Sequence, residues 1–186
     1  MRRREIAEIV AALVLDIGIE GITIRGVAAK VGFNTAVVLH YFRTKREMLI
    51  FTQKEARRRA LTRLARARGE GMDLFSCLQT VLPNTLDRWR DWHILSAFWG
   101  MSPAQPGISQ EWLDATSEAY VLFADLVRTE QERGRFDENR DPEAVAIDIQ
   151  IVINGIATLA LQDSLSWPPE RQGSSLHQNL LRMGMR

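Results

Sequence analysis

The sequence predicts an all-α protein in two parts: a three-helix head, and a helical body joined to it by a long helix. Apolar residues recur at intervals of three and four along most of the chain, as they do on one face of a helix. Glycines, prolines and helix-capping residues divide these stretches, and none shows the alternation of a half-buried strand. The parts also differ in charge, since residues 1–70 hold 15 Lys/Arg and 7 Asp/Glu whereas residues 71–186 hold 9 and 16. A basic N-terminal part suits contact with a polyanion such as nucleic acid.

The first helix of the head is predicted at residues 3–17. Its apolar residues form one stripe at helical spacing, and its acidic residues lie around the rest of the helix. The stripe consists of Ile6, Ile9, Val10, Leu13, Val14 and Ile17. Gly18 and Gly21 are predicted to end the helix. The arginines at residues 2–4 either reach an adjacent minor groove of DNA or form a disordered tail.

Residues 23–45 are predicted to form two short helices joined by a three-residue turn. Thr23 is a favourable N-cap for a helix at 24–31, and Gly32 ends that helix where a left-handed residue is needed. Asn34 caps the second helix, at 35–42. This arrangement is a helix-turn-helix, and its second helix could enter a groove of DNA. The predicted core of the head comprises Ile22, Val27, Val31, Val38 and Phe42.

A long helix is predicted to join head and body, running from Lys45 to about residue 68 and broken by Gly69 and Gly71. Its six arginines between residues 57 and 68 either extend the basic surface or form an ordinary solvated face. Further helices are predicted at 74–91, 92–101, 108–133, 142–166 and 170–183, with Pro83 bending or breaking the first and a loop at 102–107.

Residues 144–165 are apolar around most of the helical circumference, with small residues at Gly155, Ala157 and Ala160. A helix at the edge of a small body would carry more polar residues. This helix is therefore predicted to lie at the centre of the body, or to be covered on its outer side by a second copy of the chain.

Membrane insertion and export are not predicted. The longest apolar run is interrupted by Asp148, Gln150 and Asn154, which indicates a buried helix rather than a membrane span. Acidic residues interrupt the apolar stretch after the basic N-terminus, so it does not resemble a signal peptide. The lone Cys77 allows no intrachain disulfide and favours a reducing cytoplasm.

The sequence contains no pattern that predicts catalysis. His40, His93 and His177 lie far apart along the chain, and there is no nucleophile elbow, phosphate loop or HExxH motif. We therefore expect no enzyme activity, cofactor or metal. Two alternatives to a DNA-binding protein stay open: a helical small-molecule enzyme or carrier with a basic patch, and a structural interaction protein.

The string GFNTAVVLHYFRTKREML resembles the DNA-binding signature of the TetR family of one-component repressors. The matching positions are Gly32, His40, Tyr41, Phe42 and Lys45. The resemblance implies a helix-turn-helix DNA-binding domain at residues 1–48 and a helical effector-binding and dimerisation domain at residues 49–186. It also implies a homodimer formed through the last two long helices.

The body resembles that of the BetI-type branch, whose named member senses choline. The matching segments are Ala97-Phe98-Trp99, Gln105-Pro106, Gly134-Arg135-Phe136 and Asp141-Pro142. The branch's pattern Asp-Gly-Leu-Trp-Leu-Arg is replaced by Asn154-Gly155-Ile156-Ala157-Thr158-Leu159. Because an acid, an aromatic residue and an arginine are missing, we expect an effector that is larger and more apolar than choline, with or without a positive charge.

Seven residues of the head are predicted to contact double-stranded DNA. Thr35 could meet a base edge or a thymine methyl group, and the resemblance places Leu39 toward the groove. The resemblance also assigns His40 and Tyr41 to phosphate, and Lys45 stands where its charge can meet a phosphate. The full set is Arg25, Asn34, Thr35, Leu39, His40, Tyr41 and Lys45.

Large aromatic residues are concentrated in one third of the body. They are Trp89, Trp92, Phe98, Trp99, Trp112, Tyr120 and Phe123. Rings that line a gap between helices, with an acid such as Asp125 or Asp148 nearby, would suit a cationic or aromatic organic effector. The alternative is that the rings only fill the core.

These observations predict a cytoplasmic, homodimeric transcriptional regulator. It would act as a repressor that leaves a palindromic operator when a small organic effector binds the body. Effector binding would favour a spacing of the two heads that no longer fits successive major grooves.

Overall fold

The computed structural model describes residues 2–97 and 106–186, with the side chains of these ranges except those of 106–116. The described helices are α1 (Arg2–Gly21), α2 (Ile24–Val31), α3 (Thr35–Tyr41), α4 (Lys45–Gly69), α5 (Leu74–Gln79), α6 (Leu86–Ala97), α7 (Pro106–Glu132), α8 (Pro142–Gln162) and α9 (Pro169–Met183). Among the described residues, β pairing is limited to one isolated bridge between Phe136 and Met185. The predicted all-α class is confirmed.

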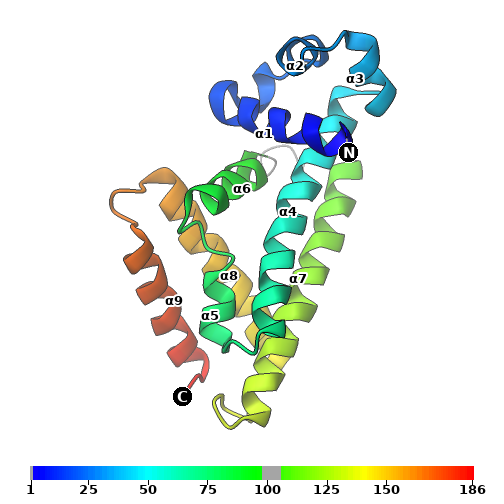
Figure 1. Cartoon of the computed structure of the whole chain (residues 1–186). Helices are drawn as coiled ribbons and strands as arrows, with labels where there is room; N and C mark the ends of the chain where they lie inside the picture. The colour runs from blue at the N-terminus through cyan, green and yellow to red at the C-terminus, as the bar shows by residue number, and fades with distance from the viewer. Residues whose placement is uncertain (1, 98–105) are drawn as a thin grey trace.

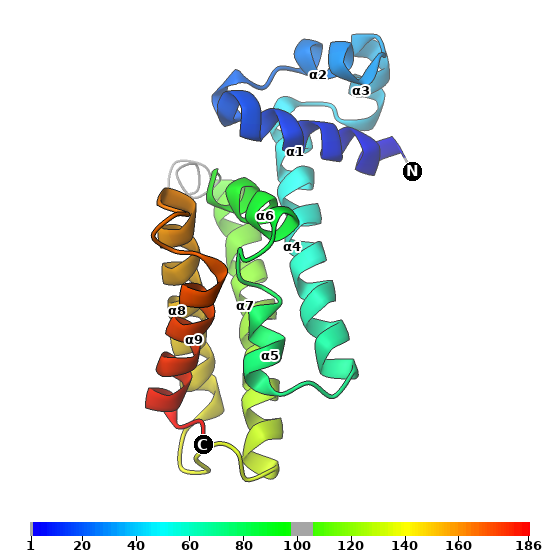
Figure 2. The ribbon, with the colours of Figure 1, turned by 60° about the vertical axis from the view of Figure 1, so that its left-hand side comes forward.

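The molecule consists of a head at one end and an elongated helical body (Figure 1). Helices α1, α2 and α3 form the head, and α4 passes from the head down the length of the body. The turned view shows α1 lying across the end of the body above α6 (Figure 2). The head therefore contacts the body through α4 and through α6.

The head has its own apolar core. Of the five residues predicted for it, Ile22, Val27, Val38 and Phe42 are buried and Val31 packs at its edge. Ile94 of α6 is buried in the same cluster. A helix of the body is thus part of the packing that holds the head.

The larger core lies in the body, where four helices form a ring. Helix α4 packs against α6 and α7, and α8 packs against the same two helices. Because α4 and α8 share both neighbours, they lie on opposite sides of this ring. Trp92 of α6, Phe123 of α7 and Ile153 of α8 point into the shared core.

The segment predicted at 74–91 is broken at Pro83, which is one of the two outcomes predicted for this proline. Helix α5 ends at Gln79 and α6 begins only at Leu86, because Pro83 lies between them and proline cannot continue a helix. The predicted break between Asp91 and Trp92 is wrong: both lie inside α6. The end of the helix predicted at 92–101 and most of the loop predicted at 102–107 lie outside the described residues.

The helix predicted at 142–166 is shorter in the structure. Helix α8 ends at Gln162, and the Asp163 side chain accepts a hydrogen bond from the Ser166 backbone N–H at 3.0 Å. This local bond stabilises a turn in place of another helical turn. The boundaries of the other helices agree with the prediction within two residues, except that the chain after Gly18 continues as a short helical turn to Gly21.

Candidate DNA-binding surface and ligand cavity

Short-range capping fixes the two helices of the helix-turn-helix. The Thr23 hydroxyl accepts a hydrogen bond from the Gly26 backbone N–H at 2.9 Å, and Asn34 Oδ1 accepts one from Val37 at 3.0 Å. Between the helices Gly32 has φ 74°, a left-handed conformation that glycine adopts without a side-chain clash. The direction of α3 is therefore determined by residues at its two ends and in the turn before it.

Helix α3 buries one side and presents the other to solvent. Val38 is fully buried in the head core, which fixes the rotation of the helix about its axis. Thr35 and His40 are exposed, and Leu39 is 42% exposed. The exposed side of α3 therefore combines a hydroxyl, an imidazole and an apolar side chain.

The other predicted DNA-contacting residues are held in different ways. Arg25 is exposed at the start of α2, whereas the Asn34 side chain is engaged in capping α3. Tyr41 is partly buried against the head core, with its ring 5.1 Å from the ring of His40. Lys45 Nζ donates a hydrogen bond to the backbone carbonyl of Glu20 at 3.1 Å. Apart from Asn34, these side chains retain donors that can meet a phosphate.

The start of α4 is anchored by an acidic residue. The Glu47 backbone N–H donates to the Thr44 hydroxyl at 3.0 Å, and Glu47 Oε2 accepts from the Arg43 backbone N–H at 2.9 Å. This pair resembles a capping box, except that the acid binds the N–H of the residue before the N-cap. Arg3 Nη2 adds a bond to Glu47 Oε1 at 2.7 Å, and its guanidinium lies over the Phe42 ring.

Many basic residues of the N-terminus and of α4 form ion pairs within the chain. Arg3 and Arg4 lie in α1 and pair with acids of α4, so residues 2–4 are neither a disordered tail nor an arm extended toward a groove. Along α4, Arg58 pairs with Glu55, and several other arginines pair with acids of α1, α6 and α7. Much of the positive charge that the sequence places near the head is thus matched within the chain.

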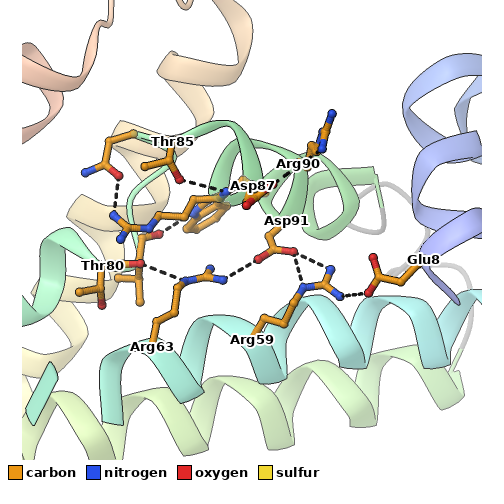
Figure 3. A network of polar contacts seen from close by, with 12 residues as sticks. Glu8, Arg59, Arg63, Thr80, Thr85, Asp87, Arg90 and Asp91 are labelled. Carbon is orange, nitrogen blue, oxygen red and sulfur yellow. Dashed lines mark hydrogen bonds and ion pairs between the residues drawn. The ribbon is translucent and has the colours of Figure 1, made fainter. Parts of the chain in front are cut away.

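A chain of ion pairs joins α1, α4 and α6 (Figure 3). The Asp91 side chain is 4% exposed and binds two arginines of α4. Its Oδ1 accepts from Arg59 Nη2 at 2.6 Å and from Arg59 Nε at 2.9 Å, and its Oδ2 accepts from Arg63 Nη1 at 2.9 Å. Arg59 Nη1 also donates to Glu8 Oε1 of α1 at 2.7 Å. Burial opposes the charged form of Arg59, but the hydrogen bond and charge of Asp91 outweigh it and raise its pKa.

A cavity of about 180 Å³ lies in the body, bordered by the ring of α4, α6, α7 and α8. Three of the predicted aromatic residues line it: Trp92 from α6, and Tyr120 and Phe123 from α7. The Trp92 indole N–H donates to the Val81 backbone carbonyl at 2.6 Å, which fixes the ring against one wall. The structure therefore brings together residues that lie far apart in the sequence.

The remaining predicted aromatic residues do not all belong to this group. Trp89 lies one turn before Trp92 on α6 and does not line the cavity; its ring centroid is 3.8 Å from that of His93. Phe98 and Trp99 lie outside the described residues, and Trp112 lies in α7 where only the backbone is described. Burial lowers the pKa of His93, so its imidazole is neutral near pH 7.

The cavity contains polar residues that the sequence interpretation missed. These are Gln53 and Arg57 from α4, and Gln150 and Asn154 from α8. A glutamine or an arginine at such a position has the pattern of an ordinary solvated helix face, so only the packing of four helices reveals them. Neither of the acids considered from the sequence lines the cavity. Asp125 pairs with Arg68 and Arg128, and Asp148 is exposed on the surface.

The outer face of α8 carries an uncovered apolar stripe. Ile147, Ile151, Gly155 and Leu159 follow one another at intervals of four and are exposed, with Ile151 at 62%. A Cβ atom added at Gly155 would have no neighbour within 4 Å. The length and mean hydropathy of α8, 1.9, would also allow it to cross a membrane, as is true of many core helices. Its inner face packs in the body core.

Comparison with known proteins agrees with this architecture. The family model described as "BetI-type transcriptional repressor, C-terminal" matches residues 72–183. The HTH-type transcriptional regulator PksA of Bacillus subtilis is 23% identical over 167 residues, which are 87% of this chain and 80% of that protein. A transcriptional regulator from Rhodococcus sp. Rha1 superposes with a TM-score of 0.86 at 21% identity, covering 98% of this chain and 96% of the other.

A second solved structure gives an equally close superposition. It is a transcriptional regulator from Saccharomonospora viridis in complex with choline, with a TM-score of 0.86 and 22% identity, covering 100% of this chain and 98% of the other. The helix-turn-helix head on a helical body, together with the family model, defines a transcriptional regulator. The chain belongs to the TetR family, and its body is of the BetI type.

Proposed function

We propose that the protein is a cytoplasmic repressor that binds a palindromic operator as a homodimer and leaves it when a small organic effector occupies the body cavity. The observation that carries DNA recognition is the orientation of α3. Val38 holds one side of this helix in the head core, and Thr35, Leu39 and His40 therefore face outward. Residues 1–48 would bind DNA, and residues 49–186 would bind the effector and the second subunit.

The contacts divide into those that read bases and those that hold the backbone. Thr35 and Leu39 would meet base edges and thymine methyl groups in the major groove. His40, Tyr41 and Lys45 would meet phosphates on one side of the groove, and Arg25 would meet phosphates from α2. Lys45 can do so while bonded to the Glu20 carbonyl, because its ammonium group has three N–H donors. Asn34 would act by capping α3.

Dimerisation would use the exposed apolar stripe of α8 together with α9. A two-fold axis between two such bodies would cover the stripe and place two heads at the spacing of successive major grooves. Gly155→Arg would put a charge into this interface at a site where the single chain has free space. Sedimentation at micromolar concentration should show twice the chain mass for the wild type and mostly monomer for Gly155→Arg. A wild-type monomer would refute the dimer.

The chain of ion pairs gives a route from cavity to head. Trp92 lines the cavity, and its neighbour Asp91 holds Arg59, which in turn binds Glu8 of α1. A ligand that displaces α6 would therefore act on α1 and change the angle of the head. Its effect on DNA would be limited by the difference in its affinity for the two arrangements.

Selection of bound duplexes from a random pool tests the function directly. The full-length protein should select a two-fold symmetric sequence, and a subset of added small organic molecules should reduce its recovery. An enzyme or carrier with a basic patch would select no symmetric site. The observation that would refute the proposal is retention of DNA without sequence preference at physiological salt.

A further inference from the structure

The body cavity is lined by aromatic rings from two helices and by a pair of carboxamides from a third. Trp92 of α6 and Tyr120 and Phe123 of α7 supply the rings. Gln150 and Asn154 of α8 supply the carboxamides, one helical turn apart. A ligand that fills the cavity would therefore place an apolar part against α6 and α7 and a polar part against α8.

The volume of the cavity limits the size of this ligand. It is about 180 Å³. A cavity of about 150 Å³ in another protein holds one benzene molecule. The cavity thus has room for a single ring, or an aliphatic group of that size, together with a short polar group.

Gln150 and Asn154 are bonded to each other. Gln150 Nε2 donates to Asn154 Oδ1 at 2.8 Å, and both residues are half-buried. A carboxamide consists of a carbonyl oxygen, which accepts, and an amino group with two N–H donors. The bond within the pair uses the amino group of Gln150 and the oxygen of Asn154. It leaves the Gln150 oxygen as an acceptor and the Asn154 amino group as a donor for a third group.

A ligand that satisfies this pair needs a donor and an acceptor of its own. A ligand that lacks either would displace water from the pair without replacing its hydrogen bonds, which costs free energy. An ionised carboxylate has no donor for the Gln150 oxygen, and a quaternary ammonium group has neither a donor nor an acceptor. A hydroxyl group has both, but on a single atom. An amide or lactam carries a carbonyl oxygen and an N–H on neighbouring atoms, and so matches two groups that belong to different residues.

Helix α4 adds a third carboxamide on the opposite side of the cavity. Gln53 is 4% exposed and lines the cavity. Its side chain is uncharged and can donate as well as accept. Arg57 of the same helix also lines the cavity, but it has partners within the chain, one of which is Glu118, and it can only donate. The acceptor that a ligand N–H needs on α8 is therefore provided by Gln150.

We propose that the cavity binds a small neutral ligand that has an aromatic or aliphatic body and an amide or lactam group, and that this group bonds to Gln150 and Asn154. The ligand class rests on the proposed function of the cavity as the effector site. It narrows the expectation from the sequence, which left a positive charge on the effector open.

Four probes with the same ring and different polar groups test the proposal. Titration calorimetry with the full-length protein would compare 3-phenylpropionamide with its N,N-dimethyl derivative, which has no N–H, and with 3-phenylpropionate and trimethylphenethylammonium. The primary amide should bind about tenfold more tightly than each of the others, as expected for the loss of one hydrogen bond that is not replaced. It should also be the only probe that lowers recovery of selected DNA. Equal or tighter binding of another probe, or no binding of the primary amide, would overturn the ligand class.

An isosteric variant tests the donor of the pair. Asn154→Asp keeps the oxygen that Gln150 binds and removes the amino group, so binding of 3-phenylpropionamide should weaken about tenfold. Asn179→Asp is the matched control, because Asn179 is a half-buried asparagine of α9 that does not line this cavity. It should change binding less than twofold. Equal losses in the two variants would contradict a role for Asn154 in ligand binding.

A second variant tests the acceptor independently. Gln150→Met has a side chain of similar length without the carbonyl oxygen, so the primary amide should lose its preference over the N,N-dimethyl derivative. Thermal unfolding of each variant shows whether it is folded at the temperature of the titration. A preference that persists in folded Gln150→Met would remove this residue from the site.

The outcomes for the ligand and for the regulator can be distinguished. DNA selection is performed without any ligand, so a symmetric operator together with a failed probe panel would reject the amide and leave the repressor intact. Calorimetry needs no DNA, so amide binding without a selected operator would support the ligand class and reject the repressor.

Discussion

The head of this protein has a closed apolar core, whereas the body contains a cavity. In the head, Val27, Val38 and Phe42 are fully buried in a closed core, and each helix end next to the turn is capped. In the body, four helices leave a cavity, and Gln53, which is 4% exposed, lines it. A surface that reads DNA gains from a fixed position, whereas a sensor needs space for its ligand. Substitutions at the two places should therefore differ in the sign of their effect on stability.

The largest effect is expected in the closed core. Phe42→Ala removes a fully buried ring, and we expect the free energy of unfolding to fall by about 3–5 kcal/mol and operator binding to be lost. Urea unfolding and a gel-shift assay would measure both. Phe33→Ala is the control, because Phe33 lies partly exposed in the adjoining turn and should cost much less. A similar small cost for both variants would show that the head core is not tightly packed.

The next effect is expected where head and body meet. Asp91→Ala would leave Arg59 and Arg63 partly buried without their common acceptor, at a cost of about 3 kcal/mol. It should also weaken the effect of ligand on DNA binding, which a titration of operator release would show. Asp87→Ala removes an exposed acid from the same helix and should change neither property. Normal release in Asp91→Ala would exclude this route of coupling.

Within the DNA-binding surface two kinds of contact should respond differently. Thr35→Ala should change the preference at one base position by roughly 1–3 kcal/mol, whereas Lys45→Ala should weaken binding to all sequences. Lys45→Ala should also lower the dependence of log affinity on log salt concentration by about one. Binding to a set of operator variants at several salt concentrations separates them. An unchanged salt dependence in Lys45→Ala would remove this residue from the phosphate contacts.

The smallest expected change in stability is a gain instead of a loss. Gln53→Leu replaces a carboxamide that lines the cavity by an apolar side chain of similar size, so the ligand-free protein should gain about 1 kcal/mol of stability. Thermal unfolding of the ligand-free protein measures this gain. Destabilisation of the free protein would mean that the body is packed as the head is.

The head could be predicted from the sequence because its determinants are local. Thr23, Gly32 and Asn34 act on backbone groups within a few residues, and the apolar spacing of α1 to α3 identifies the buried faces. The motif around His40 and Tyr41 is contiguous as well. The sequence did not reveal the partners of the charged side chains. One example is the hydrogen bond from Lys45 to the backbone carbonyl of Glu20.

The body was predicted less completely because its site is formed by residues distant in sequence. Aromatic content identified Trp92, Tyr120 and Phe123, but it could not separate them from Trp89, which does not line the cavity and contacts His93. Arg57 was counted with the basic surface of α4, since a helical pattern does not show which charges turn inward. The polar residues of α4 and α8 line one cavity only because four helices pack together around it.

Helix α6 contributes Trp92 to the core of the body and Ile94, two residues later, to the core of the head. For the proposed repressor, substitutions within one turn of this helix should therefore have opposite effects on the regulated gene. Alleles that alter residue 92 should silence the regulated gene permanently, because the inducer is no longer sensed. Alleles that alter residue 94 should express the gene constitutively, because the head is no longer held. Codons two positions apart would then give opposite phenotypes, and a reporter screen of α6 would display both.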